Sequence, residues 1–126
     1  MATATPYSIT YQQGPNFTAT AGAALTAGQR VYFDSAGLAQ VAGNTIVGDA
    51  VAQEITASGA VGIFRFLNSQ GTTVCQAAGT IAAGDTIHAA AAGQVTNSGT
   101  DPVVGRAMSA GTAGNPIEVL VNRGQL

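Results

Sequence analysis

The sequence predicts an all-β fold, a small β-barrel or sandwich built from two pseudo-repeated strand units, with an extended N-terminal arm. Three observations carry this prediction. The 126 residues include 17 glycines, whose close spacing leaves little room for helices of about 11 residues. The apolar residues alternate with polar ones, as in strands. The same pattern of turns and strands also occurs twice along the chain.

The expected N-terminal arm covers residues 1–20, MATATPYSITYQQGPNFTAT. Tyr7, Ile9 and Tyr11 alternate with polar residues, while prolines and a glycine interrupt the segment. An arm of this kind can add a strand to the sheet edge of a neighbouring molecule. The alternative is a frayed terminus.

Residues 21–126 are expected to form a single β domain with pseudo-repeat units at about 21–67 and 77–122. LTAG at 25–28 matches IAAG at 81–84, and the next glycines keep this offset of 56. IVGDAV at 46–51 matches VVGRAM at 103–108 with an offset of 57, and VGIF at 61–64 matches IEVL at 117–120 with an offset of 56. Two such units could pair about a pseudo-two-fold axis and share one core.

Under this alignment Asp49 and Arg106 occupy equivalent positions with opposite charge. Pairing about a pseudo-dyad would allow a salt bridge between them, and the alternative is that both are solvated, where a pair is worth about 0–1 kcal/mol. Between the units, NSQGTTVCQAAG at 68–79 is expected to be a linker with one strand.

The segment VGIFRFLN, residues 61–68, is apolar on both faces. Phe64 and Phe66 share one face, and Val61, Ile63 and Arg65 share the other, which is typical of a strand that is central or lies at an interface. Near the C-terminus, Ile117, Val119 and Val121 alternate with Glu118, Leu120 and Asn122 in the same manner.

Four consecutive alanines, residues 89–92, raise the question of a helix, because alanine has the highest helix propensity. Gly84 and Gly93 flank them closely, however. The pattern therefore favours a strand at 85–89, a turn at 90–93 and a second short strand at 94–96. A single helical turn within 89–92 is the alternative.

The composition bounds the function. Charged residues make up 8% of the chain, lysine is absent and the net charge is −2. A nucleic-acid ligand is not expected, because phosphate binding needs clustered cations. So few charges indicate a surface partly covered by a partner, or else a monomer coated with neutral polar residues. No apolar run reaches the roughly 18–20 residues of a membrane helix, and no signal peptide is recognisable, so we expect a product made in the cytoplasm.

No arrangement of residues predicts catalysis, a metal site or a cofactor site. His88 and Cys75 are the only histidine and cysteine; one of each falls short of a zinc ligand set, and nothing indicates that they meet as a nucleophilic pair. Phosphate-binding glycine motifs and calcium loops are absent from the sequence. We therefore expect no enzyme activity and no cofactor.

The repeated motifs resemble a known family. IAAGDTIHAAAAGQVTNSG followed by PVVGRAMSAGTAGNPIEVLV, within residues 81–121, is similar to the C-terminal signature of head decoration (capsid cement) proteins of tailed double-stranded DNA bacteriophages. AGQRVYFDSAGLAQVAGNTIVGDAV resembles the N-terminal half of that signature, so the resemblance covers about residues 20–122.

This resemblance implies a structural virion protein on the outer surface of an expanded capsid. It would bind the major capsid protein as homotrimers at three-fold and quasi-three-fold junctions and stabilise the shell, without contacting nucleic acid or a membrane. An N-terminal arm commonly contributes to the contact. Multivalent binding by three copies would supply the affinity without any chemistry.

Two residue sets are the expected contacts of such a protein. Aromatic residues are enriched at interface hot spots, so the arm is expected to contact the capsid through Tyr7, Ile9, Tyr11 and Phe17. The expected trimer interface consists of Phe64, Arg65, Phe66 and Leu120. The alternative functions are a phage tail or fibre module, or another β module that binds a receptor or glycan, and a barrel that binds a small ligand.

Overall fold

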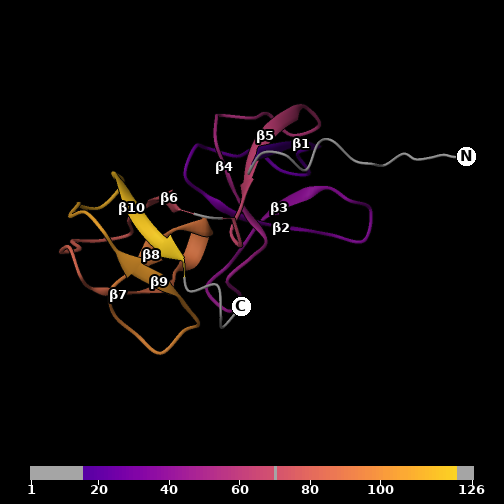
Figure 1. The fold of residues 1–126 in the computed structure, drawn as a ribbon. Helices are drawn as coiled ribbons and strands as arrows, with labels where there is room; N and C mark the ends of the chain where they lie inside the picture. Colours follow the sequence, from indigo (N-terminus) through magenta and orange to yellow (C-terminus); the bar gives the residue numbers. More distant parts are fainter. Residues whose placement is uncertain (1–15, 70, 122–126) are drawn as a thin grey trace, which may run out of the picture.

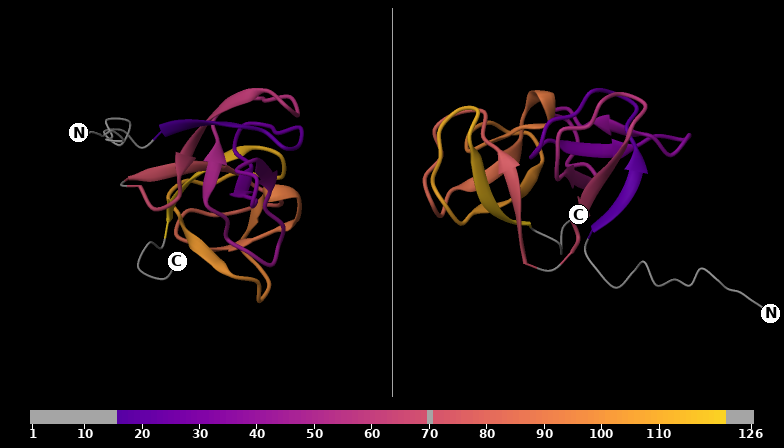
Figure 2. Two further views of the ribbon diagram at one scale, coloured as in Figure 1. Left: turned by 90° about the vertical axis from the view of Figure 1, so that its right-hand side faces the viewer. Right: turned by 90° about the horizontal axis from the view of Figure 1, so that it is seen from above.

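The computed structural model describes residues 16–69 and 71–121, which form two five-stranded antiparallel sheets (Figure 1). The first sheet contains β1 (Asn16–Thr20), β2 (Arg30–Phe33), β3 (Ala39–Val41), β4 (Ala50–Ala52) and β5 (Val61–Phe66). The second contains β6 (Thr72–Gln76), β7 (Thr86–Ala89), β8 (Val95–Thr96), β9 (Val103–Ala107) and β10 (Pro116–Val121). The two sheets lie side by side as the two halves of the molecule (Figure 2).

Both sheets have the same strand order, which confirms that the chain contains two copies of one unit. The order is β1-β5-β4-β2-β3 in the first sheet and β6-β10-β9-β7-β8 in the second. Adding five to each strand number of the first order gives the second order. The all-β prediction is confirmed, and the described residues contain no α-helix.

Neither sheet closes into a barrel. Of the two predicted architectures, a barrel or a sandwich, the structure agrees with the sandwich. In the first sheet the chain just after β1 meets β3 at an isolated bridge between Ala21 and Ala39. An isolated bridge between Ala77 and Val95 does the same in the second sheet. Because each pair of edges meets at a bridge and not along a strand ladder, each sheet is rolled but open.

The repeat begins earlier than expected. β1 pairs with β5 along its whole length, and β6 pairs with β10 in the same way. The last five residues of the predicted arm, 16–20, therefore belong to the first sheet, and the strand in the predicted linker is the first strand of the second unit. NFTAT and TTVCQ have no identical residue at equivalent positions, and this hid the equivalence from sequence comparison.

The register of the repeat also corrects the alignment. The offset is 56 over the first three strands of each unit, but 55 over the last two. Gly28 N–H donates to Ala52 O at 2.8 Å, and Gly84 N–H donates to Ala107 O at 2.7 Å. The equivalent of Ala52 is thus Ala107, two residues before the match given by an offset of 57. For the last strand the predicted offset of 56 is one residue too large. Because side chains alternate between faces, this error exchanges the two faces of that strand.

Asp49 and Arg106 are consequently not equivalent. Val51 lies between Arg30 and Arg65 in the first sheet. Arg106 holds the same place between Thr86 and Leu120 in the second. The Asp49 carboxylate accepts the Phe33 N–H at 2.9 Å, a hydrogen bond within the first sheet, so the equivalence that would have allowed the salt bridge does not hold.

The alanine run forms a turn between two strands, as predicted. β7 ends at Ala89, a single 3-10 turn covers Ala91–Gly93, and β8 starts at Val95. Ala92 and Gly93 both have positive φ, 57° and 72°, and the left-handed conformation favours glycine in the second of these positions. The high helix propensity of alanine therefore yields one turn only.

Each half has its own core, and the first half contributes to the second. The first core is formed by small aliphatic residues around Phe64. The second core contains Ile81, Ile87 and Ile117 from its own unit, together with Val51 and Leu67 from the first. Burial of these two side chains stabilises the contact between the halves, since each Å² of buried apolar surface contributes about 25 cal/mol of free energy.

Arg30 reinforces this contact. Its side chain is fully buried and donates to the carbonyl oxygens of Ile46 and Val47 in the first half, at 2.7 and 2.9 Å. It also donates to Ala90 O and Gln94 O in the second half, at 2.7 and 2.9 Å. The guanidinium therefore fixes the turn of the second unit against the first unit.

Candidate interaction surface

The described residues hold no grouping of three or more histidine, cysteine, aspartate or glutamate side chains that could bind a metal ion. Cys75 is fully buried, and burial raises the pKa of its thiol to about 12, an effect that the Arg30 charge partly offsets. His88 is half-buried on β7, and its Nδ1 lies 2.8 Å from Asp101 O. The structure also offers surface hollows and exposed apolar side chains. Among the described residues, no helix is long and apolar enough to cross a membrane.

The expected arm contacts fall into two groups. Tyr7, Ile9 and Tyr11 lie outside the described residues. Phe17 lies in β1, half-buried. Its ring stacks on Phe66 at a centroid distance of 3.9 Å. Phe17 is thus part of the first sheet.

All four phenylalanines of the chain form one cluster on the first sheet. Phe17 lies 5.4 Å from Phe33 and 5.9 Å from Phe64, centroid to centroid, and Phe33 lies 5.8 Å from Phe64. Phe64 is fully buried at the centre. The prediction that Phe64 forms a trimer interface is therefore wrong, because the Phe64 side chain points from β5 into the first core.

The other three predicted interface residues remain accessible but lie apart. Phe66 is 40% exposed and borders a hollow with Phe33 and Asp49 on the first sheet. Arg65 is half-buried, and its Nε donates to Thr73 Oγ1 of the second sheet at 3.3 Å. Leu120 is 43% exposed on the second sheet, where it borders a separate hollow. Phe66 and Leu120 thus border different hollows, and Arg65 contacts the other sheet.

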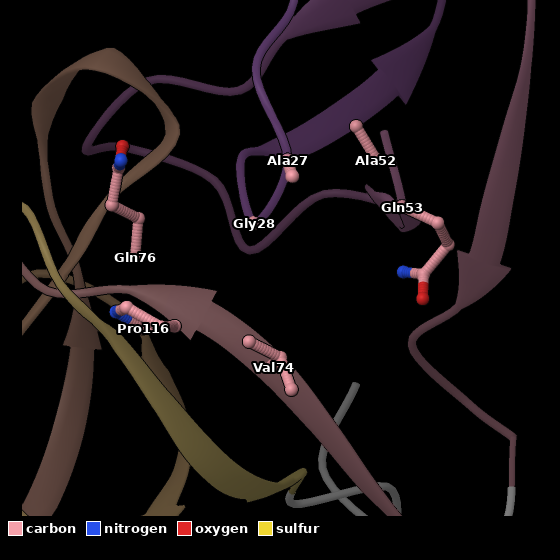
Figure 3. A pocket seen from close by; sticks show the side chains of 7 residues that line it. All are labelled: Ala27, Gly28, Ala52, Gln53, Val74, Gln76 and Pro116. Atoms are coloured by element: carbon pink, nitrogen blue, oxygen red, sulfur yellow. The ribbon is translucent and has the colours of Figure 1, made fainter. Parts of the chain in front are cut away.

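A groove of about 440 Å³ lies on the surface between the two sheets (Figure 3). Its walls consist of small and neutral residues: Ala27, Gly28, Ala52, Gln53, Val74, Gln76 and Pro116. Gln53 and Gln76 project from opposite sides of the groove. With no ionisable side chain in its lining, this groove can make van der Waals contacts and hydrogen bonds but cannot carry acid–base chemistry.

A second hollow, of about 320 Å³, was not anticipated from the sequence. It lies on the outer face of the second sheet and is bordered by Thr86, Arg106 and Leu120, among others. Met108, 47% exposed, follows β9 directly. Alternation of apolar and polar residues predicts that one face of these strands points outward, but it does not show that Leu120 and Met108 are exposed on that face.

Two turn carboxylates shape the loops. Hydrogen bonds from the Gln40 side chain and the backbone N–H groups of Leu38 and Ala36 lower the pKa of Asp34. A hydrogen bond from Asn97 at 2.8 Å and another from the Ala82 N–H at 2.9 Å lower the pKa of Asp85. Both carboxylates act locally, as aspartates in turns commonly do.

Comparison with known proteins places the fold. No protein-family profile matches the chain, and no curated protein sequence matches it. Among solved structures, the chain is similar to the head fiber gp8.5 N base in bacteriophage phi29, with a TM-score of 0.74 and 18% sequence identity. The similarity covers 86% of this chain and 93% of that one. The two proteins therefore share a fold over nearly the whole of both chains.

Proposed function

We propose that this protein is a structural component of a bacteriophage head that binds the outside of the expanded capsid and stabilises it. The observation that carries the proposal is the fold shared with the phi29 head fiber base over 86% of this chain. The resemblance of residues 81–121 to capsid decoration proteins supports it independently.

The partner in this proposal is the major capsid protein, and the binding unit is a homotrimer at three-fold and quasi-three-fold junctions. A single chain of 12.4 kDa with small side chains offers modest contact area. Three linked copies that engage three equivalent subunits raise the total affinity through effective concentration. Because the trimer binds the expanded shell in preference to dissociated subunits, it stabilises that shell by linkage.

Residues 1–15 are the proposed capsid-contacting arm, with Tyr7, Ile9 and Tyr11 as anchors. β1 starts at Asn16, on an edge of the first sheet. A segment joined to this edge strand can reach a neighbouring protein and pair with it by strand addition. Phe17 no longer belongs to this set, since its ring contacts lie within the first sheet.

Co-sedimentation with heads of the phage that encodes this chain tests the proposal. The full-length protein should pellet with expanded heads, should bind unexpanded heads at least ten-fold more weakly, and should raise the temperature at which the expanded shell dissociates. Deletion of residues 1–15 should weaken binding while leaving the solution fold intact. Absence of binding to expanded heads would refute the proposal.

A further inference from the structure

The two sheets contact each other through unlike surfaces. The first sheet uses its outer row, Arg30, Val51 and Arg65, which are neighbours on β2, β4 and β5. The second sheet uses β6 and residues 90–94. Gln76 N–H of β6 donates to Gly28 O at 3.0 Å, and Arg30 binds Ala90 O at 2.7 Å. Such a contact is heterologous, because neither surface meets its own equivalent.

The repeat therefore leaves one copy of each surface free. The outer row of the second sheet, Thr86, Arg106 and Leu120, has the same register as Arg30, Val51 and Arg65. All three of its residues are exposed. The first-sheet equivalents of β6 and residues 90–94 are β1 and residues 34–38, since β2 pairs with β3 just as β7 pairs with β8.

We infer that a second copy of this chain docks its β1 and residues 34–38 onto the outer row of the second sheet. The contact would repeat between molecules the geometry that already joins the two sheets within one. This inference rests on the proposed trimer and specifies its interface: three copies joined head to tail form a closed ring of six equivalent sheets.

The residues at the free surfaces suit this contact. Arg65 contacts Thr73 within the chain; the equivalents of these residues are Leu120 and Phe17, which would form an apolar contact between copies. Val61 and Met108, 65% and 47% exposed, are the equivalents of Pro116 and Gln53, which line opposite walls of the groove between the sheets. Docking would thus cover three exposed apolar side chains, those of Val61, Met108 and Leu120.

Charge and backbone groups are also complementary. Arg30 and Ala90, which are in contact within the chain, have Thr86 and Asp34 as their equivalents. Arg106 lies beside Thr86 in the outer row, so docking would bring the Asp34 carboxylate near the Arg106 guanidinium. Thr20 is the equivalent of Gln76, whose N–H bonds to Gly28 O. In the docked pair the Thr20 N–H, which points to the open edge of β1 by the alternation of antiparallel pairing, would meet Gly84 O.

Cysteine cross-linking tests the inference. A Cβ placed at Gly28 would lie 3.5 Å from the Gln76 Cβ, which is the spacing of a disulfide. The equivalent pair between copies is Thr20 and Gly84. Gly84 has a φ of 92° and no atom within 4 Å of a built Cβ, so a cysteine there brings backbone strain but no clash. The native Cys75 is fully buried and should not compete.

The Thr20→Cys/Gly84→Cys double variant should oxidise to a covalent trimer that resists denaturing electrophoresis without reductant. An equimolar mixture of the two single variants should stop at dimers, and the Gly28→Cys/Gln76→Cys variant should close within one chain. Leu120→Glu should abolish the cross-link, whereas Ile55→Glu, at a residue 81% exposed and outside both surfaces, should not.

Failure of the double variant to link chains would overturn the interface, and a ladder continuing beyond three chains would overturn the closed ring. Neither outcome depends on capsid binding, since the experiment uses the purified protein alone. A covalent trimer that does not bind expanded heads would leave the interface standing and refute the proposed function.

Discussion

Arg30 determines how the two sheets sit against each other. It is the largest fully buried side chain of the described residues, and burial lowers the pKa of its guanidinium to about 10. The group is therefore still charged at neutral pH, and backbone carbonyl oxygens from both halves, rather than a carboxylate, compensate its desolvation. Hydrogen bonds to a charged group are each worth about 1.5–3 kcal/mol.

Replacing Arg30 should therefore be costly. Arg30→Met leaves several buried carbonyl oxygens without a donor, and we expect a loss of about 3–5 kcal/mol in the free energy of unfolding. Arg30→Lys should recover little, because one ammonium cannot replace the planar fork of donors. Urea unfolding measures both. Arg65→Met, at a half-buried site, is the matched control, and an equal loss there would contradict this role.

Asp34 and Asp85 predict how stability depends on pH. Their pKa values are lowered in the folded protein, so folding is favoured while both are ionised. This stabilisation is fully present above the unfolded pKa near 3.8 and is lost as pH falls through the lower folded values. Melting temperatures between pH 7 and 2 should thus drop in the acid range. Asp85→Asn should flatten that drop, and the control Glu54→Gln should not.

At the level of elements, alternation predicted the inward faces correctly where the strands are regular. Ile117, Val119 and Val121 are buried as expected, and β5 carries apolar residues on both faces. The equivalence of the units was predicted correctly in β2 and β7 but slipped in the last strands. Short motifs such as VGxA recur easily in a sequence rich in glycine and alanine, and hydrogen-bond register, which fixes the alignment, is not visible in composition.

Gly105 shows why register matters. It lies in β9 between Ile87 and Val121, and a Cβ at this position would overlap the carbonyl oxygen of Leu120. Gly105→Ala should therefore lower the free energy of unfolding by about 1–3 kcal/mol, as overpacking does. Gly43→Ala is the control, since its Cβ would meet nothing within 4 Å. Thermal unfolding that ranks the two variants equally would contradict this register.

β1 defines where the arm ends. Deletion of residues 1–15 leaves β1 complete, whereas deletion of residues 1–20 removes Phe17 from the aromatic cluster and exposes the edge of β5. We expect the shorter deletion to keep the wild-type melting temperature and the longer one to lower it by at least 5 °C, measured by circular dichroism. Equal effects would place residues 16–20 outside the cooperative fold. The sequence missed this boundary because β1 is short and half polar.

At the scale of the whole molecule, duplication of one unit produces a protein whose two halves bind each other through a heterologous contact. That contact buries Val51, Leu67 and Arg30 and leaves its second copy exposed, at β1 and at the outer row of the second sheet. A heterologous contact can close into a ring, and the inferred ring of three chains would match the three-fold junctions of the proposed capsid site. Neither surface could be located from sequence, because their residues come from distant strands.

Light scattering after size-exclusion chromatography of the purified full-length chain tests the central claim most directly, since the proposed head binding depends on a homotrimer. We predict a stable molar mass of three times the 12.4 kDa chain, reduced to one chain in Leu120→Glu and unchanged in Ile55→Glu. A monomer at all concentrations for the wild-type protein would contradict the account.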